Sequence, residues 1–306
     1  MKKELNRKEL LAEVENYITD KSLIVNSKKR SLLMVVGYTI NTFLWILFAV
    51  LIFKMNNALL VCSIIMLLIS QRHLQTHVHD TAHFFLSDNR KTNDIVGNFL
   101  YAGFIGMNIA NYRAIHQKHH KFNGSAEDPE YFSYDEVKNS GGLVSLCLRY
   151  FFGLEALKLV KKYYFSKQVN KNTVQVKSKF FHVIFCQLLL ISCFAINDLY
   201  FFYIIWVILA VTVSPLLSRL RFLVEHPGKN DTTRSTTSLF IEKVFFAPHS
   251  FNYHFEHHMW PMVPPYNLSR IHRHIRKNNF FKKNKNLINT YYFSDLFRAA
   301  KSYNVN

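Results

Sequence analysis

The chain has 306 residues, an apolar content of 49% and a formal net charge of +18. Such a charge would suit nucleic-acid binding, but the basic residues lie outside the long apolar runs, which argues against a nucleic-acid partner. The four cysteines form no C-x-x-C pair, so neither a disulfide framework nor an iron–sulfur cluster is supported.

Four uncharged apolar runs, arranged in two pairs, predict an all-α integral membrane protein with four spanning helices. The first pair covers residues 31–53 and 55–71, and the second covers residues 180–197 and 199–218. About 20 apolar residues are enough for a helix to cross hydrocarbon. Because only Lys54 and Asp198 separate the members of each pair, two helical hairpins are expected. Four buried helices in a soluble protein are the alternative, since the second and third runs are short.

The distribution of basic residues predicts the orientation of the hairpins. Lys28, Lys29 and Arg30 directly precede the first hairpin, and a second basic group follows residue 269. Basic residues accumulate on the cytoplasmic side of membrane proteins. We therefore expect a multi-pass protein with the lipid bilayer as its partner, cytoplasmic termini and hairpin tips on the opposite side. The expected divisions are a cytoplasmic N-terminal segment (1–30), a membrane domain (31–275) and a basic cytoplasmic C-terminal tail (276–306).

Two further apolar stretches are expected to lie outside the four spans. Residues 95–112 are long enough to cross, but their three glycines and three asparagines favour a re-entrant or interfacial segment. Residues 143–164 alternate apolar with charged side chains and predict an amphipathic helix on the membrane surface.

Three histidine clusters predict a metal centre. Within each cluster the spacing is i+3 or i+4, so on a helix the imidazoles share one face. Imidazole is the commonest metal-binding side chain, and three clusters are harder to explain as solvated histidines than one. All three reach the same membrane face only if residues 95–112 do not cross. The candidate ligands are His79 and His83 in the first cluster, His116, His119 and His120 in the second, and His254, His257 and His258 in the third.

The composition of the clusters favours iron over zinc. Structural zinc sites use four ligands, usually with cysteine, and this chain offers more histidines than one tetrahedral ion binds. The zinc-protease signature H-E-x-x-H is absent, as are the Glu-x-x-His pairs of soluble di-iron bundles. Eight clustered imidazoles suit two late first-row ions side by side, and iron can activate oxygen whereas zinc cannot.

The clusters and their flanking sequences, NYRAIHQKHHKFNGSAEDPEYF (111–132) and FNYHFEHHMWPMVPPYNLSRIH (251–272), resemble the membrane fatty acid desaturase superfamily, which includes related hydroxylases. The resemblance covers about residues 30–275. It implies a four-span enzyme whose cytoplasmic helical cap holds two iron ions. Such an enzyme uses O2 and two electrons to oxidise an unactivated C–H bond of an acyl chain. In this family a further histidine upstream of the last cluster commonly completes the ligand set, and here the candidate is His226.

The resemblance also implies partners. No electron-transfer domain is recognisable in the chain, so a separate ferredoxin- or cytochrome b5-like donor with its reductase is expected. The substrate is expected to be an acyl chain on coenzyme A, a carrier protein or a lipid. Desaturation is favoured over hydroxylation of a lipid, a carotenoid or a tethered metabolite, and an inert metal-binding scaffold is the alternative from another class. A bacterial inner membrane is favoured over the endoplasmic reticulum.

Other polar residues are expected to support the site. Four carboxylates are placed to accept a proton from a ligand imidazole and so fix its tautomer, namely Asp80, Asp128, Glu225 and Glu256. The remaining histidines are not expected to bind the metal. They are His73 and His77, near the site or solvated, His182, just inside the third span, and His249, His272 and His274, near the site or on the surface.

Overall fold

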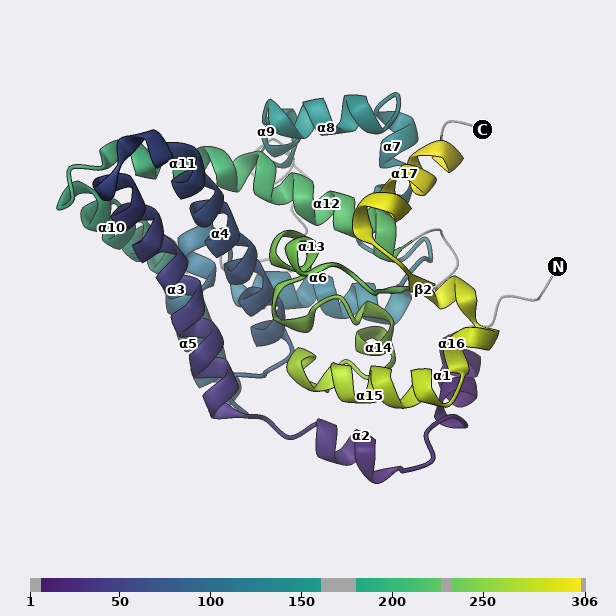
Figure 1. Ribbon diagram of the computed structural model, residues 1–306. Helices are drawn as coiled ribbons and strands as arrows, with labels where there is room; N and C mark the ends of the chain where they lie inside the picture. The colour runs from purple at the N-terminus through teal and green to yellow at the C-terminus, as the bar shows by residue number, and fades with distance from the viewer. Residues whose placement is uncertain (1–6, 161–179, 227–232, 304–306) are drawn as a thin grey trace. The chain divides into compact units, whose positions relative to one another are not determined.

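The computed structural model describes residues 7–160, 180–226 and 233–303 (Figure 1). Its described residues are mostly helical, which confirms the helical part of the predicted fold class. They divide into two compact units: unit 1 comprises Met1–Val36, Arg113–Leu143 and Arg219–Asn306, and unit 2 comprises Gly37–Tyr112 and Val144–Ser218. Unit 1 also contains two short strands, β1 (Ser235–Thr236) and β2 (Ile288–Asn289), which pair in parallel.

Unit 2 is built around the apolar helices α3 (Leu32–Met55), α4 (Leu60–Ala82), α10 (Phe181–Ala195) and α11 (Tyr200–Val211), which lie side by side (Figure 1). Helix α11 is followed directly by α12 (Val213–Glu225). Among the described residues, three helical segments are long and apolar enough to cross a membrane: Leu32–Met55, Asn57–Ala82 and Tyr200–Glu225. The fourth predicted span, α10, is apolar but shorter.

The two hairpin tips meet within unit 2. The Asn56 side chain accepts from the backbone N–H of Ala58 and begins the short helix η1 (Asn57–Leu59). At the other tip, Asn197 Nδ2 donates to the Cys193 carbonyl at the end of α10. Lys54 Nζ donates to Asn197 Oδ1 at 2.8 Å, so both tips lie at the same end of the unit.

Helix α4 continues well beyond the apolar run that predicts it. The hydropathy pattern ends the second span at Gln71, but the helix runs on to Ala82, and His83 is its C-cap. The added turns are polar and buried, with Gln71 and Arg72 donating to the carbonyls of Trp206 and Ser214. The helix need not end where apolarity ends, because these polar side chains find partners inside the protein. The predicted end of the membrane span at residue 71 stays a prediction.

Residues 95–112 do not form a continuous helix. They are divided among α5 (Arg90–Leu100), η2 (Ala102–Ile105) and the start of α6 (Ile109–Phe122), with Gly106 in the left-handed region at φ +71°. Gln187 Nε2 donates to the carbonyls of Gly103 and Phe104 at 2.9 and 3.0 Å, and Trp206 Nε1 donates to the latter at 2.9 Å. Irregular backbone is tolerated at membrane depth where protein groups satisfy it. The interrupted helix agrees with a re-entrant or interfacial segment, and its position outside the spans stays a prediction.

The predicted amphipathic helix is present as two shorter ones. Helix α8 (Leu143–Phe151) and helix α9 (Leu154–Val160) are separated at Gly153, whose φ is +70°. Leu148, Phe151 and Leu157 are exposed. The Glu155 carboxylate accepts from the side chains of Arg149 and Lys158. The last part of the prediction, residues 161–164, lies outside the described residues.

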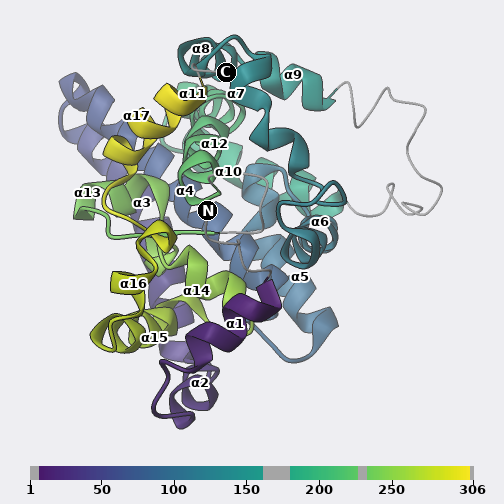
Figure 2. The same cartoon turned by 90° about the vertical axis from the view of Figure 1, so that its right-hand side faces the viewer.

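Unit 1 collects segments that are distant in sequence. Its N-terminal part holds α1 (Arg7–Glu15) and α2 (Ser22–Ser27). The segment before α8 contributes η3 (Tyr131–Tyr134) and α7 (Glu136–Asn139). The C-terminal part holds α13 (Phe240–Phe246), η6 (Pro248–Ser250), α14 (His254–Met259), α15 (Pro265–Lys277), α16 (Phe280–Lys283), η7 (Lys285–Leu287) and α17 (Tyr292–Tyr303), several of which are visible in Figure 2.

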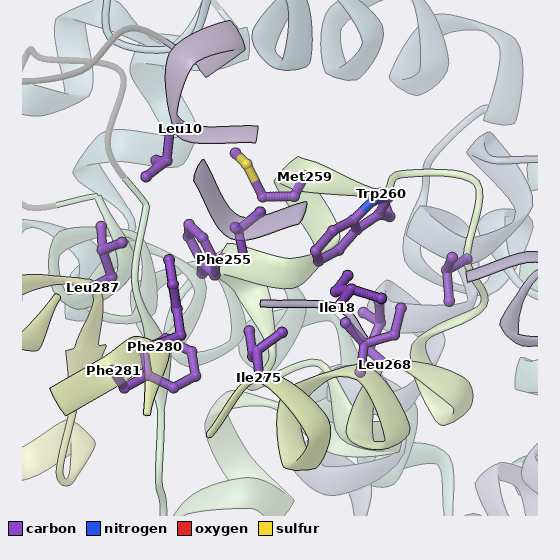
Figure 3. Close-up of a cluster of buried hydrophobic side chains, with 13 residues drawn as sticks. Leu10, Ile18, Phe255, Met259, Trp260, Leu268, Ile275, Phe280, Phe281 and Leu287 are labelled. Atoms are coloured by element: carbon purple, nitrogen blue, oxygen red, sulfur yellow. The ribbon is translucent and has the colours of Figure 1, made fainter. Parts of the chain in front are cut away.

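An aromatic and aliphatic core joins the two termini of unit 1. In Figure 3, Leu10 and Ile18 from the N-terminal segment lie in one cluster with Phe255 of α14 and Phe280 of α16. Pro265 begins α15, and Asn267 donates from its side chain to the carbonyls of Ser27 and Lys29. The sequence from Pro261 to Leu268, which follows the third cluster, thus has a structural role. It begins α15 and binds the N-terminal segment to that helix.

Candidate metal centre

Three elements present seven of the predicted histidines, all of which belong to unit 1. Helix α6 carries the second cluster, helix α14 carries the third, and His226 directly follows Glu225, the last residue of α12. All seven are buried, with exposed fractions of 8% or less. The helical spacing assumed for the second and third clusters is confirmed.

His119, His226, His254 and His258 form a four-histidine group. Each offers one ring nitrogen, and these nitrogens all lie within 4.8 Å of one another. His254 Nε2 lies 2.8 Å from His226 Nε2 and 3.1 Å from His258 Nε2. Burial lowers the pKa values of His226, His254 and His258 well below their usual range, so these rings are neutral at neutral pH. Neutral imidazole is the form that binds metal ions.

His116, His120 and His257 form a three-histidine group beside it. His120 Nε2 lies 3.0 Å from His116 Nε2 and 2.9 Å from His257 Nε2. The two groups are adjacent, because the rings of His120 and His258 have centroids only 4.3 Å apart. Unit 1 therefore contains two neighbouring sets of converging imidazole nitrogens.

The donor sets fit late first-row metal ions. A nitrogen ligand binds at about 2.1 Å, which puts the ligand atoms of one ion roughly 3–4 Å apart. The spacings within both groups agree with this. Imidazole suits iron, zinc and copper alike, so the donor type alone does not choose among them. Two adjacent groups do favour a two-metal centre over a single tetrahedral ion.

Asp128 fixes the tautomer of His119, as predicted for one of the four carboxylates. His119 Nδ1 lies 3.1 Å from both carboxylate oxygens and donates to them, which leaves Nε2 for a metal. The backbone N–H groups of Gly124 and Glu130 hold the carboxylate in place.

Glu225 lies beside a second candidate ligand, with Oε2 3.5 Å from His254 Nδ1. Glu256 has another partner. It accepts from His272 Nδ1 at 2.7 Å and from the Ser235 hydroxyl, rather than from a histidine of the clusters. The reason is helical geometry, since residues at i and i+2 do not face each other and Glu256 is two positions after His254. His272 is correspondingly buried and is not a surface residue.

The first cluster belongs to unit 2, at the C-terminal end of α4. His79 and His83 are buried, with ring centroids 4.9 Å apart. His79 Nδ1 lies 3.2 Å from Asp80 Oδ1, as expected for a carboxylate that orients a ligand. Their assignment as ligands stays a prediction.

The other histidines of unit 2 have structural partners. Thr42 Oγ1 donates to the Tyr38 carbonyl, so it accepts from His77 Nε2 at 3.0 Å. The His77 ring also stacks on Tyr101 at 4.3 Å. His182 Nε2 donates to the Met107 carbonyl at 2.9 Å. His73 and His77 are buried, so of the two predicted roles the solvated one is wrong.

Sequence reasoning missed two residues that support the four-histidine group. Arg221 Nη2 lies 2.7 Å from Glu225 Oε2, and Tyr292 donates to Glu225 Oε1 at 2.6 Å. Arg221 stands one helical turn before Glu225, and that spacing is a usable signal. Tyr292 lies far along the chain in no motif, and nothing in the sequence marks it.

Apolar helices of membrane-spanning length and two adjacent groups of buried histidines fit the class of helical membrane proteins with a polyhistidine metal site. The family model for fatty acid desaturases matches residues 55–292. The match covers most of the chain and all the candidate ligands, and the chain belongs to the fatty acid desaturase family. Membership makes it an oxidoreductase by class. None of the curated proteins compared with the chain matches it.

Proposed function

We propose that this protein is a membrane-bound di-iron desaturase that introduces a carbon–carbon double bond into an acyl chain. The observation that carries the proposal is the pair of adjacent histidine groups in unit 1, in a chain of the desaturase family. Zinc would fill such sites but does not activate O2, whereas iron does. The proposed reaction converts –CH2–CH2–, O2, two electrons and two protons into –CH=CH– and two water molecules.

The ligands divide between two ions. His119, His226, His254 and His258 would hold one ion, and His116, His120 and His257 would hold the other. His79 and His83 are proposed as further ligands because the resemblance to the desaturase superfamily includes the first cluster. When bound there, iron supplies the oxygen-activating chemistry that removes hydrogen from an unactivated methylene. Asp128 holds the proton of His119 at Nδ1, and Asp80 is placed to do the same for His79. Burial of every ligand excludes water from the reacting atoms.

The substrate and the membrane orientation are parts of the same proposal. An acyl chain reaches a membrane enzyme from the bilayer, into which it partitions by about 0.8 kcal/mol per methylene. We propose four spans, formed by α3, α4, α10 and α11 with the start of α12. The contact between Lys54 and Asn197 supports placing both hairpin tips on one side. The basic termini and the metal centre would lie on the cytoplasmic side. Two electrons would come from a separate ferredoxin- or cytochrome b5-like protein.

Product analysis tests the reaction. The protein would be expressed in a host that supplies a donor and reductase, and its lipids would be compared by mass spectrometry with those of a host expressing His120→Ala. Loss of two hydrogens from an acyl chain is expected only with the native protein. Gain of one oxygen would identify a hydroxylase on the same scaffold, and unchanged lipids together with bound metal would identify an inert metal-binding protein.

Cysteine labelling tests the orientation. In a variant stripped of native cysteines, a cysteine at position 56 or 197 should react with a membrane-impermeant reagent added from outside, and one at position 123 should not. Reagent access to positions 89 and 123 from opposite sides would show that residues 95–112 cross the membrane and would contradict a shared centre.

A further inference from the structure

The segment that follows α16 contacts the C-terminal end of α12. His226 of the four-histidine group directly follows this helix. Asn289 in β2 donates from Nδ2 to the Val224 carbonyl at 2.9 Å. Three residues later, the Tyr292 hydroxyl donates to Glu225 Oε1 at 2.6 Å. Tyr292 is almost fully buried, and its ring stacks on Phe246 of α13 with centroids 5.0 Å apart. The C-terminal segment therefore holds both the backbone and the carboxylate next to His226.

Glu225 shares its second oxygen between two neighbours. Oε2 lies 2.7 Å from Arg221 Nη2 and 3.5 Å from His254 Nδ1. Arg221 Nη2 is also 3.2 Å from the same His254 nitrogen. The guanidinium packs over the Phe251 ring at 3.6 Å, which keeps it beside His254. A carboxylate and a guanidinium thus compete for one ring nitrogen of a candidate ligand.

The outcome of this competition decides whether His254 can bind a metal through Nε2. Arginine only donates hydrogen bonds, so Nδ1 must accept if it pairs with Arg221. A neutral ring that accepts at Nδ1 carries its proton on Nε2 and has no lone pair there for a metal. If Nδ1 instead donates to Glu225, Nε2 is free and faces His226 and His258 at 2.8 and 3.1 Å. The carboxylate must stay close to His254 for the second arrangement to prevail.

Tyr292 is placed to keep it there. Its hydroxyl occupies Oε1, which orients Oε2 towards Arg221 and His254. Burial raises the pKa of Tyr292 well above its usual range, so the hydroxyl keeps its proton and remains a donor. Without this hydroxyl, Oε1 would lose its contact with Tyr292, while Arg221 would still bind Oε2 and favour the non-binding tautomer.

We propose that Tyr292 is a positioning residue of the four-histidine group, which fixes Glu225 so that His254 presents Nε2 to the metal. The inference rests on the proposed function, because it takes this group as one of two metal sites. It extends the site beyond the histidine clusters, to a residue of the C-terminal segment that does not touch the metal.

Cobalt(II) titration of the full-length apoprotein in detergent, followed by its visible ligand-field bands, tests the inference. The variants are Tyr292→Phe and the control Tyr291→Phe, which makes the same change at the neighbouring exposed tyrosine. In the native protein two cobalt ions should bind. In Tyr292→Phe one site should keep its affinity and the other should weaken by about 10- to 100-fold, the range typical of residues that orient a ligand. Tyr291→Phe should match the native protein.

His258→Ala assigns the weakened site. This substitution removes a ligand from the four-histidine group alone, so adding Tyr292→Phe to it should cause no further loss at the remaining site. Equal weakening of both sites in Tyr292→Phe would indicate a general folding defect and overturn the inference, as would native affinity at both. A native protein that binds no cobalt would contradict the proposed function itself, and that result is distinct from either.

Discussion

The outward faces of α3 and α10 in unit 2 carry exposed apolar side chains, among them Leu47, Phe48 and Leu188. The exposed face of α15 in unit 1 carries Arg270 and Arg273 instead. The interiors differ as well, although both contain buried apolar side chains. Unit 1 encloses the apolar cluster drawn in Figure 3, whereas α4 of unit 2 buries Ser70, Gln71, Arg72 and His73 in succession.

The exposed apolar faces of α3 and α10 fit a hydrocarbon surrounding for these helices. An apolar outer surface is stable in hydrocarbon, where every buried polar group must find a partner within the protein. The amide nitrogen of Gln71 finds its partner in the Trp206 carbonyl, and that of Gln187 finds its partner at η2. Unit 1 has an apolar core and a charged face on α15, while α13 and α17 also expose Phe240 and Phe297. Its buried histidines are the groups to which we assign function.

The largest expected effect is the difference in turnover and iron content between variants of a buried histidine in each unit. His120→Ala in unit 1 removes a proposed ligand, so turnover should fall below about a thousandth, since metal ions supply several kcal/mol of catalysis. His77→Ala in unit 2 removes a ring that is hydrogen-bonded to Thr42, and that variant should keep its iron. Turnover and iron content of both variants, measured in purified protein, provide the comparison. Equal iron loss in the two would break the distinction between the units.

A substitution at His226 tests which buried histidines of unit 1 are metal ligands. If it is a ligand, His226→Ala should lower iron content as strongly as His258→Ala, because both belong to the four-histidine group. A role through another residue would instead reduce affinity by about 10- to 100-fold and leave much of the metal in place. His274→Ala is the control, since that ring contacts Thr19 and Asn278 away from the group. Native iron content in His226→Ala would remove this residue from the set.

The smallest expected effect concerns the packing of unit 2. A Cβ added at Gly103 would lie 2.5 Å from Cys186 Sγ and 2.7 Å from the His182 carbonyl oxygen. Gly103→Ala should therefore destabilise the protein by about 1–3 kcal/mol. Gly37, on α3, has open space around the same position, and Gly37→Ala should be neutral or stabilise by up to about 1 kcal/mol. Thermal unfolding in detergent measures both, and a lower midpoint for Gly37→Ala than for Gly103→Ala would contradict the packing at η2.

The elements best predicted from the sequence are those whose pattern is local. The apolar runs predict α3 and α10, and the i+4 spacing of histidines predicts the helical second and third clusters. The end of α4 is not predictable in this way, because Gln71 and Arg72 are polar by type and buried only through partners from distant segments. The glycines of residues 95–112 predict the break in the helix at η2. The hydrogen bonds that Gln187 and Trp206 donate to η2 have no signal in the sequence.

The candidate ligands were predictable, whereas most residues that orient them were not. A ligand must be one of a few residue types at a helical spacing, and that constraint is visible in the sequence. A residue that acts through another needs only a hydrogen bond, which Tyr292 makes to Glu225 from 67 positions away. Glu256 shows the reverse error. It stands between two candidate ligands in sequence, yet on the helix it points towards His272.

Metal analysis of the purified full-length protein tests the central claim most directly. After expression with sufficient iron, elemental analysis should give close to two irons per chain in the native protein. Two adjacent histidine groups in unit 1 are the basis for this stoichiometry. One zinc per chain with no iron, under the same conditions, would contradict the account.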